Sequence, residues 1–207
     1  YIDLAGEFRE HGHDVTVMAP DVNHKSTFLN QERGMNVLRV KTNPVLGVKN
    51  MFRKGIGLAL LPFQFKRAYN KYLKDSLFDW VFMPTPPITL AGFVDYMKRK
   101  TNAKLYLILR DIHPQSSASI GLIKNRFSYN YLAGKAAKAY EIADLIGCMS
   151  QGNIDFIAAN YPDIDESKLV LLMNWQKYEV IDYGKTDIRE KYNLKDKFIV
   201  LFGGNIG

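Results

Sequence analysis

Asp111 and His113, two residues that can move protons, follow a short apolar run at residues 104–109. Polar residues flank the run on both sides, a pattern typical of a buried strand of a parallel sheet. Because Pro114 cannot donate a hydrogen bond to a sheet, we expect the strand to end near Asp111. Ligands of open α/β sheets bind beyond the carboxyl ends of the strands. Both residues are therefore candidates for acid–base chemistry; the alternative is an ordinary turn that Asp111 stabilises by bonding to the backbone.

Short apolar segments alternate with amphipathic ones along the chain. We expect strands at residues 14–20, 35–40, 78–83, 104–109, 145–149 and 168–173. We expect helices at residues 1–11, 49–75, 88–100, 125–143 and 150–160. This alternation predicts an α/β fold, a Rossmann-like parallel sheet with right-handed crossovers and helices on both faces. The strand that would precede the first helix, normally the central one, is missing, so we expect a further amino-terminal segment.

Prolines and polar residues are expected to interrupt these elements. Residues 21–34 are polar and are expected to form a loop. Pro20 and Pro84 are expected to end their strands, and Pro62 is expected to kink or break the helix at 49–75.

The carboxyl-terminal part has a different organisation. Residues 175–186 lose apolar periodicity, a short helix is expected at 187–192, and a strand at 197–202 runs into Gly203 and Gly204. A strand followed by glycines lets backbone N–H groups approach a phosphate. We therefore expect three parts: a domain at 1–174, a linker with a short helix at 175–196, and the start of a second domain at 197–207.

The composition is that of an ordinary globular protein, with 207 residues, 47% hydrophobic and 24% charged. No apolar run is long enough to span a membrane, and no signal peptide is visible. The lone cysteine, Cys148, lies in an apolar run and is expected to be a small buried residue. Without a disulfide, the cytoplasm is the expected compartment.

The net charge of +7 is concentrated between Lys41 and Lys74, where there are eight basic residues and no acidic one. Apolar residues are interleaved with them, a mixture typical of a helix that lies in a lipid interface. The candidates for facing an anionic membrane, at the inner face of the plasma membrane, are Arg53, Lys54, Lys66 and Arg67. The alternative is a core helix with a solvated basic face. Nucleic acid is not expected as a partner, because no recognition helix, zinc motif or RNA-binding motif is visible.

Four stretches occur in order at residues 12–17 (Gly-His-Asp-Val-Thr-Val), 111–116 (Asp-Ile-His-Pro-Gln-Ser), 173–175 (Met-Asn-Trp) and 198–207 (Phe-Ile-Val-Leu-Phe-Gly-Gly-Asn-Ile-Gly). Together they resemble the family 4 glycosyltransferases, especially bacterial members that build lipopolysaccharide, O-antigen and capsule. The resemblance implies a GT-B architecture, in which two Rossmann-like domains face each other across a cleft. This chain would hold the amino-terminal, acceptor-side domain and the start of the nucleotide-sugar domain. The implied activity is retaining transfer, without metal or cofactor, from a nucleotide-sugar to a glycan or polyprenyl-linked acceptor.

The resemblance also implies roles for particular residues. His113 and Asp111 fall where the family often has Asp-x-Trp-Pro-Glu-Ser, with His113 in place of the aromatic residue and Gln115 in place of the acid. Both are the expected catalytic residues. The expected donor-binding loop near the phosphates is Gly203, Gly204 and Asn205.

The acceptor side of the cleft is expected to involve two further pairs of residues. Ser150 and Gln151 match the family's Ser-Glu at the start of a helix, and Ser150 is also a helix cap by residue type. Thr85 and Pro86 lie in a rigid turn after a predicted strand, which places them at the ligand-binding edge of the sheet.

Two other functions fit the same fold. One is a nucleotide-sugar epimerase, which would not need the basic, apolar stretch. The other is a binding module without catalytic activity, which would apply if the nucleotide-binding half were absent. A dehydrogenase using NAD is not favoured, because the G-x-G-x-x-G fingerprint is not present.

Overall fold

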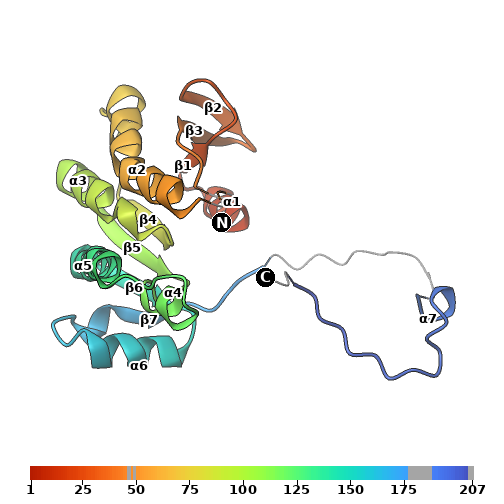
Figure 1. Ribbon diagram of the computed structural model, residues 1–207. Coiled ribbons are helices and arrows are strands. Elements are labelled where there is room, and N and C mark those ends of the chain that lie inside the picture. Colours follow the sequence, from red (N-terminus) through yellow and green to blue (C-terminus); the bar gives the residue numbers. More distant parts are fainter. Residues whose placement is uncertain (46–47, 49, 177–187, 205–207) are drawn as a thin grey trace. The chain divides into compact units, whose positions relative to one another are not determined.

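A computed structural model describes residues 1–45, 48, 50–176 and 188–204, without the side chains of residues 51 and 52 (Figure 1). The chain divides into two compact units, Tyr1–Trp175 and Gln176–Gly207. The first unit contains the strands β1 (Thr16–Asp21), β2 (Phe28–Glu32), β3 (Met35–Lys41), β4 (Trp80–Thr85), β5 (Lys104–Leu109), β6 (Leu145–Cys148) and β7 (Leu169–Leu171). Its helices are α1 (Ile2–Glu10), α2 (Met51–Tyr72), α3 (Ala91–Thr101), α4 (Gln115–Ser119), α5 (Arg126–Ile142) and α6 (Gln151–Asn160), with single 3-10 turns at η1 (Ile88–Leu90) and η2 (Glu166–Lys168).

Four strands form a parallel sheet in the order β4-β5-β6-β7. The predicted α/β class is confirmed. The register pairs Thr85 with Leu109, Leu109 with Cys148, and Cys148 with Leu171. The residues that follow this row therefore leave the sheet at one level, along its carboxyl edge.

The other three strands form a second sheet in the order β1-β3-β2, with β1 parallel and β2 antiparallel to β3. The prediction of a loop throughout residues 21–34 was wrong, because β2 forms a hairpin with β3. Arg33 and Gly34 make the turn, with φ of 51° and 73°, the positive values that a two-residue hairpin turn requires. Glu32 and Arg39 form an ion pair across the two strands, so polar residues stabilise this hairpin.

Prolines do not end β1 and β4. Each strand continues one residue past its proline, to Asp21 after Pro20 and to Thr85 after Pro84. Within the part of the chain that is described, both are edge strands with one hydrogen-bonded neighbour, and an edge strand tolerates the missing proline N–H. The additional strand expected ahead of α1 stays a prediction. Pro62 lies inside α2, which runs on without a break.

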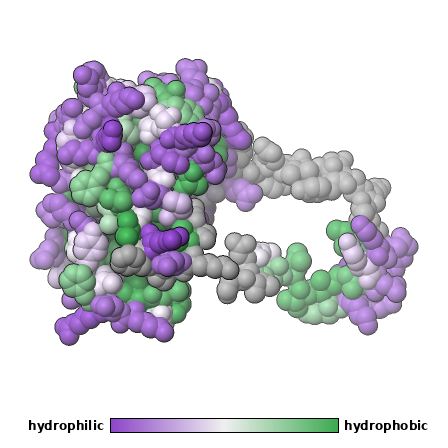
Figure 2. All heavy atoms as spheres, turned by 45° about the horizontal axis from the view of Figure 1, so that its top comes forward, coloured by the Kyte–Doolittle hydropathy of each residue, from purple (hydrophilic) through white to green (hydrophobic). Residues whose placement is uncertain are grey.

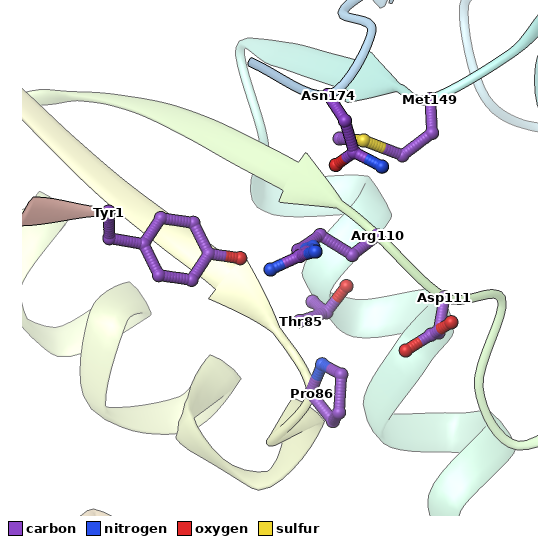
Figure 3. A pocket seen from close by; sticks show the side chains of 7 residues that line it. All are labelled: Tyr1, Thr85, Pro86, Arg110, Asp111, Met149 and Asn174. Carbon is purple, nitrogen blue, oxygen red and sulfur yellow. The ribbon is translucent and has the colours of Figure 1, made fainter. Parts of the chain in front are cut away.

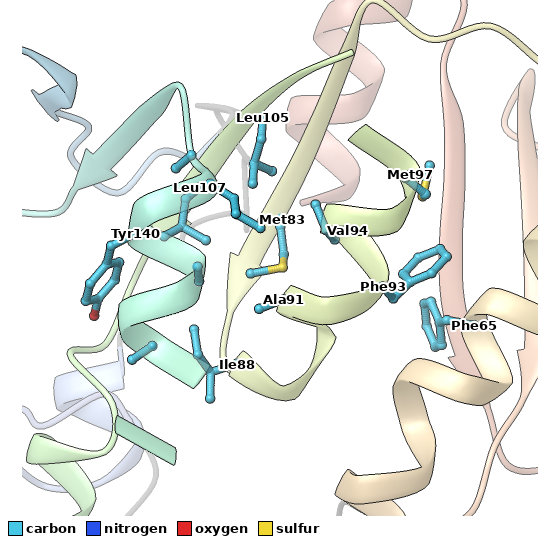
Figure 4. Packing of buried hydrophobic residues seen from close by; sticks show 14 of the residues in the cluster. Phe65, Met83, Ile88, Ala91, Phe93, Val94, Met97, Leu105, Leu107 and Tyr140 are labelled. Atoms are coloured by element: carbon cyan, nitrogen blue, oxygen red, sulfur yellow. The ribbon is translucent and has the colours of Figure 1, made fainter. Parts of the chain in front are cut away.

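Helices cover both faces of the parallel sheet because successive side chains of a strand point to opposite sides. On one face, Met83 and Leu107 belong to the core that η1, α3 and α5 complete (Figure 4). On the other face, Phe82 stacks on Tyr106 with ring centroids 5.5 Å apart, and its ring lies 5.1 Å from that of Phe8 in α1. The predicted arrangement of helices on both faces is therefore confirmed.

Two titratable residues stand at the two ends of β6: Cys148 ends the strand, and Asp144 directly precedes it. Cys148 is buried, as predicted, and burial raises the pKa of its thiol to about 11. At the opposite edge, the carboxylate of Asp144 lies 2.5 Å from the Lys98 ammonium and accepts the Leu105 N–H at 2.7 Å. Burial raises the pKa of Asp144, but these two partners more than offset it and bring the pKa below the usual value. The carboxylate thus joins α3 and β5 at the start of β6.

The second unit contains the short helix α7 (Ile188–Lys191). The prediction of a strand at 197–202 was wrong for this structure, in which these residues have no regular secondary structure. Phe198 and Leu201 are 95% and 89% exposed. A strand forms only when other strands satisfy its backbone groups, and the described residues of this unit supply none. The predicted division at 174 and 196 stays a prediction.

Candidate functional site

A cavity of about 340 Å³ opens at the carboxyl edge of the parallel sheet (Figure 3). Its lining consists of Tyr1, Thr85, Pro86, Arg110, Asp111, Met149 and Asn174. Four of these seven residues end, or directly follow, β4, β5 or β6, Asp111 is the second residue after β5, and Asn174 comes shortly after β7. The register of the sheet therefore brings Thr85 and Asn174 to the same cavity, although they lie 89 positions apart in the sequence.

The strand ends hold this lining rigidly. Thr85 is only 1% exposed, and its hydroxyl donates to the carbonyl of Ile108 at 3.3 Å. That bond ties the end of β4 to β5, so Thr85 forms a fixed wall of the cavity. Pro86, the next residue along the chain, also lines the cavity.

The charged groups of the cavity come from the loop after β5. Arg110 and Asp111 are both exposed, and the Arg110 guanidinium carbon lies 5.7 Å from the ring centroid of Tyr1 (Figure 3). Asn174 adds an amide to the lining. A guanidinium, a carboxylate, a phenol and an amide around a small cavity can bind the hydroxyl and phosphate groups of a polar ligand.

His113 lies in the same loop but not in the lining of the cavity. Its ring is partly buried, and its Nδ1 lies 3.0 Å from the hydroxyl oxygen of Ser117. Burial lowers the pKa of His113; Asp111 acts in the opposite direction, and the positive charge of Lys54 lowers the pKa further. The pKa of His113 is therefore below its usual value, so the imidazole is neutral at pH 7 and can accept a proton.

The other predicted site residues occupy different positions. Ser150 accepts the Asn153 N–H at 3.3 Å as the cap of α6, and Gln151 donates to Asp155 at 2.8 Å. Both are exposed and stand outside the lining of the cavity, next to Met149, which belongs to it.

The predicted donor-binding loop belongs to the second unit. Gly203 and Gly204 are exposed there. Asn205 lies outside the described residues. The assignment of this loop to donor phosphates stays a prediction.

The basic residues predicted to face a membrane do not share one environment. Arg53 and Arg67 are exposed on α2. Lys66 is also exposed, but its ammonium lies 4.1 Å from the ring centroid of Tyr96 on α3. Lys54 is half-buried, close enough to His113 to affect its pKa.

Four lining residues were not singled out as site residues by sequence reasoning: Tyr1, Arg110, Met149 and Asn174. For Arg110 and Met149 a signal was present, because each directly follows an apolar strand and the carboxyl edge is where ligands bind. Tyr1 precedes a helix, and the sequence around it gives no sign that it reaches this edge.

Comparisons with protein-family models and with curated proteins find no match to the chain. Solved structures do match. Sucrose-phosphate synthase from Thermosynechococcus elongatus superposes with a TM-score of 0.66 over 93% of this chain, at 11% identity. The fold resembles a Rossmann-like domain of a GT-B glycosyltransferase. A shorter form of the same synthase gives a TM-score of 0.56 over 85% of this chain and 84% of its own, at 10% identity.

A plant protein extends this likeness. Arabidopsis thaliana UGT89C1, solved in complex with UDP-L-rhamnose, matches 82% of this chain with a TM-score of 0.50 and 14% identity. At these identities the likeness concerns the fold. The chain spans 45% of the synthase and 44% of UGT89C1, slightly less than half of each.

Proposed function

We propose that this chain is part of a glycosyltransferase that moves a sugar from a nucleotide-sugar to a glycan or lipid-linked acceptor in cell-surface polysaccharide synthesis. The observation that carries the proposal is the polar cavity at the carboxyl edge of a GT-B-like sheet, lined by Arg110 and Asp111. The structure of UGT89C1 with UDP-L-rhamnose supports a nucleotide-sugar as the donor class.

In this proposal the cavity binds the acceptor, with Thr85 and Pro86 as its wall. Neutral His113 accepts or shares the proton of the acceptor hydroxyl, and Asp111 orients the hydroxyl or the ring. Departure of a nucleoside diphosphate needs stabilisation of developing negative charge, which backbone N–H groups and basic side chains can supply. Gly203, Gly204 and Asn205 are the proposed source of N–H groups, and the transfer is proposed to retain configuration and to need no metal ion.

The test is a transfer assay on the protein that contains this chain. It is incubated with a panel of nucleotide-sugars and a polyprenyl-diphosphate-linked acceptor, with release of nucleoside diphosphate and glycosylated product both measured. Product that depends on the acceptor supports the proposal. An epimerised nucleotide-sugar formed without acceptor would identify the epimerase, and donor binding without either product would identify a binding module.

A pair of variants tests whether the cavity takes part. Asp111→Asn removes the carboxylate from the lining, whereas Asp163→Asn makes the same change at an exposed position outside it. We expect the first to lower transfer by about tenfold or more, the loss of a charged hydrogen bond, and the second to leave transfer unchanged. Equal activity of both variants would remove Asp111 from the mechanism.

A further inference from the structure

Helix α2 presents apolar side chains on two opposite sides. Toward the core, Leu61, Phe65 and Tyr69 are 3%, 4% and 0% exposed. On the outer side, Ile56, Leu60 and Phe63 are 43%, 39% and 70% exposed. Ile56, Leu60 and Phe63 are only partly buried in this structure. Burying a large apolar side chain fully is favourable by about 1.5–3 kcal/mol, so covering these three would release free energy.

These apolar side chains belong to one stripe along the helix. The outer stripe consists of Arg53, Ile56, Leu60, Phe63, Arg67 and Lys71, at successive spacings of three or four residues. That spacing places all six on one side of an α-helix. The stripe therefore has an apolar centre with cationic side chains toward both ends. On the face of the molecule that Figure 2 shows, hydrophobic and hydrophilic residues are interspersed.

Within the described parts of the chain, the cations of the outer stripe have no acidic counterpart. Residues Met51–Tyr72 include no Asp or Glu. Among the described residues, no carboxylate forms an ion pair with Arg53, Arg67 or Lys71. An exposed surface with unpaired cations around apolar side chains complements a surface of opposite charge that also accepts apolar groups. An anionic bilayer has both properties, because its headgroup phosphates lie directly above its acyl chains.

The amino-terminal end of α2 lies beside the candidate site. Lys54, one residue after Arg53, is close enough to His113 for its charge to act on the imidazole. None of the described helices is long and apolar enough to cross a bilayer. Lys54 lies on the core side of the helix, so a surface bound along the outer stripe would be separated from the loop that carries Asp111 and His113 by the width of α2, about 10 Å.

We propose that the outer stripe of α2 docks on an anionic lipid bilayer. Ile56, Leu60 and Phe63 enter the interface, while Arg53, Arg67 and Lys71 contact lipid phosphates. Docking would hold the acceptor-side cavity next to lipid-linked substrates. That last consequence rests on the proposed function, whereas the docking itself is measured independently of catalysis.

The experiment is co-sedimentation of the protein that contains this chain with vesicles of phosphatidylcholine, with and without 30% phosphatidylglycerol. We expect binding to the anionic vesicles that weakens as salt is added. The double variant Leu60→Ser and Phe63→Ser is expected to lower the partition coefficient by about tenfold or more. Arg53→Glu with Arg67→Glu is expected to lower it by a similar factor and to remove the preference for anionic lipid.

The matched control is the pair Arg126→Glu and Phe127→Ser on α5, where Phe127 is 81% exposed. It changes the same residue types away from α2 and is expected to bind as the unmodified protein does. Circular dichroism melting checks that every variant is folded. Absence of binding to anionic vesicles, or equal losses in the control pair and the α2 variants, would overturn the proposal.

A second readout reports insertion directly. Relative to the unmodified protein, which already contains Trp80 and Trp175, Phe63→Trp is expected to gain tryptophan emission that shifts to the blue with anionic vesicles and is quenched by brominated acyl chains. An unchanged spectrum in the presence of bound vesicles would contradict insertion of the stripe. Vesicle binding without any glycosyl transfer would support docking and refute the proposed function. Glycosyl transfer without vesicle binding would support the proposed function and refute docking.

Discussion

The Nδ1 atom of His113 lies 3.0 Å from the hydroxyl oxygen of Ser117, one helical turn further along the chain. In the neutral imidazole one ring nitrogen carries the proton, and the Ser117 hydroxyl oxygen can accept a hydrogen bond from Nδ1–H. Nε2 is then unprotonated and able to accept a proton, and the hydrogen bond fixes the orientation of the ring. Ser117 is thus a positioning residue for His113.

The first prediction concerns the role of His113 in transfer. In the complete protein, His113→Ala is expected to lower kcat by about 100-fold or more, the usual contribution of a proton-transferring side chain. Ser117→Ala leaves the imidazole in place and is expected to lower kcat by only a few-fold, with KM unchanged. The measurement is steady-state kinetics of transfer, and unchanged turnover of His113→Ala would exclude the residue from the chemistry.

The second prediction concerns pH. Burial lowers the pKa of His113 in the folded state below its ordinary value of 6.5, so the unfolded chain binds this proton more readily as pH falls. The contribution of neutral His113 to the free energy of unfolding is therefore present in full above about pH 6.5 and is lost progressively as the pH falls below that value. His113→Gln lacks this contribution, so its urea midpoint should change less between pH 7 and pH 5 than that of the unmodified protein. Identical pH profiles would contradict the prediction.

A third prediction separates binding from chemistry in the cavity. Arg110 is exposed and its charge belongs to the lining, so Arg110→Ala should not affect folding. We expect the KM for a phosphate-bearing acceptor to rise about tenfold or more, as for loss of a charged hydrogen bond, while kcat stays within twofold. Arg110→Lys should recover only part of the loss, because an ammonium cannot form the bidentate contact of a guanidinium. A fall in kcat with unchanged KM would instead place Arg110 in the transition state.

A fourth prediction uses two glycines with opposite surroundings. A Cβ atom at Gly147 would lie 2.7 Å from a ring carbon of Tyr106 and 2.8 Å from a methyl of Leu172. Gly147→Ala is therefore expected to lower the free energy of unfolding by about 1–3 kcal/mol, as for other overpacked positions. At Gly134, inside α5, nothing lies within 4 Å of the added atom, and Gly134→Ala should raise stability by about 0.5–1 kcal/mol. Urea denaturation measures both, and a stable Gly147→Ala would refute the close contact.

The fifth prediction concerns the carboxylate that joins α3 and β5. Asp144→Ala removes the acceptor of the Leu105 N–H and one of the two acceptors of Lys98, which keeps the Ile142 carbonyl, and we expect a loss of about 1.5–3 kcal/mol in the free energy of unfolding. The control is Glu141→Ala, which breaks a solvent-exposed pair with Lys138 and should cost less than about 0.5 kcal/mol. Similar thermal midpoints for the two variants would mean that Asp144 behaves as an ordinary surface charge.

Much of the fold was predictable because the parallel strands carry strong local signals. The run at 104–109 is apolar throughout its centre, and it forms β5 with the bounds expected. Ser150 caps α6 for a reason that is local to the chain, since its hydroxyl reaches the N–H three residues later. Strand β2 was missed because its stability comes from pairing with β3 and from the Glu32–Arg39 ion pair. A polar sequence indicates neither of these contacts.

For the candidate site, the sequence by itself placed Asp111 and His113 after a strand and Thr85 after another. Only the tertiary structure decided which of these residues meet. The register of β4, β5, β6 and β7 brings Thr85 and Asp111 to one cavity with Asn174, while the His113 ring contacts Ser117 and is not part of the lining. The physical reason is that strand order and register are fixed by packing between distant segments, whereas spacing along the chain reports only which residues are local neighbours.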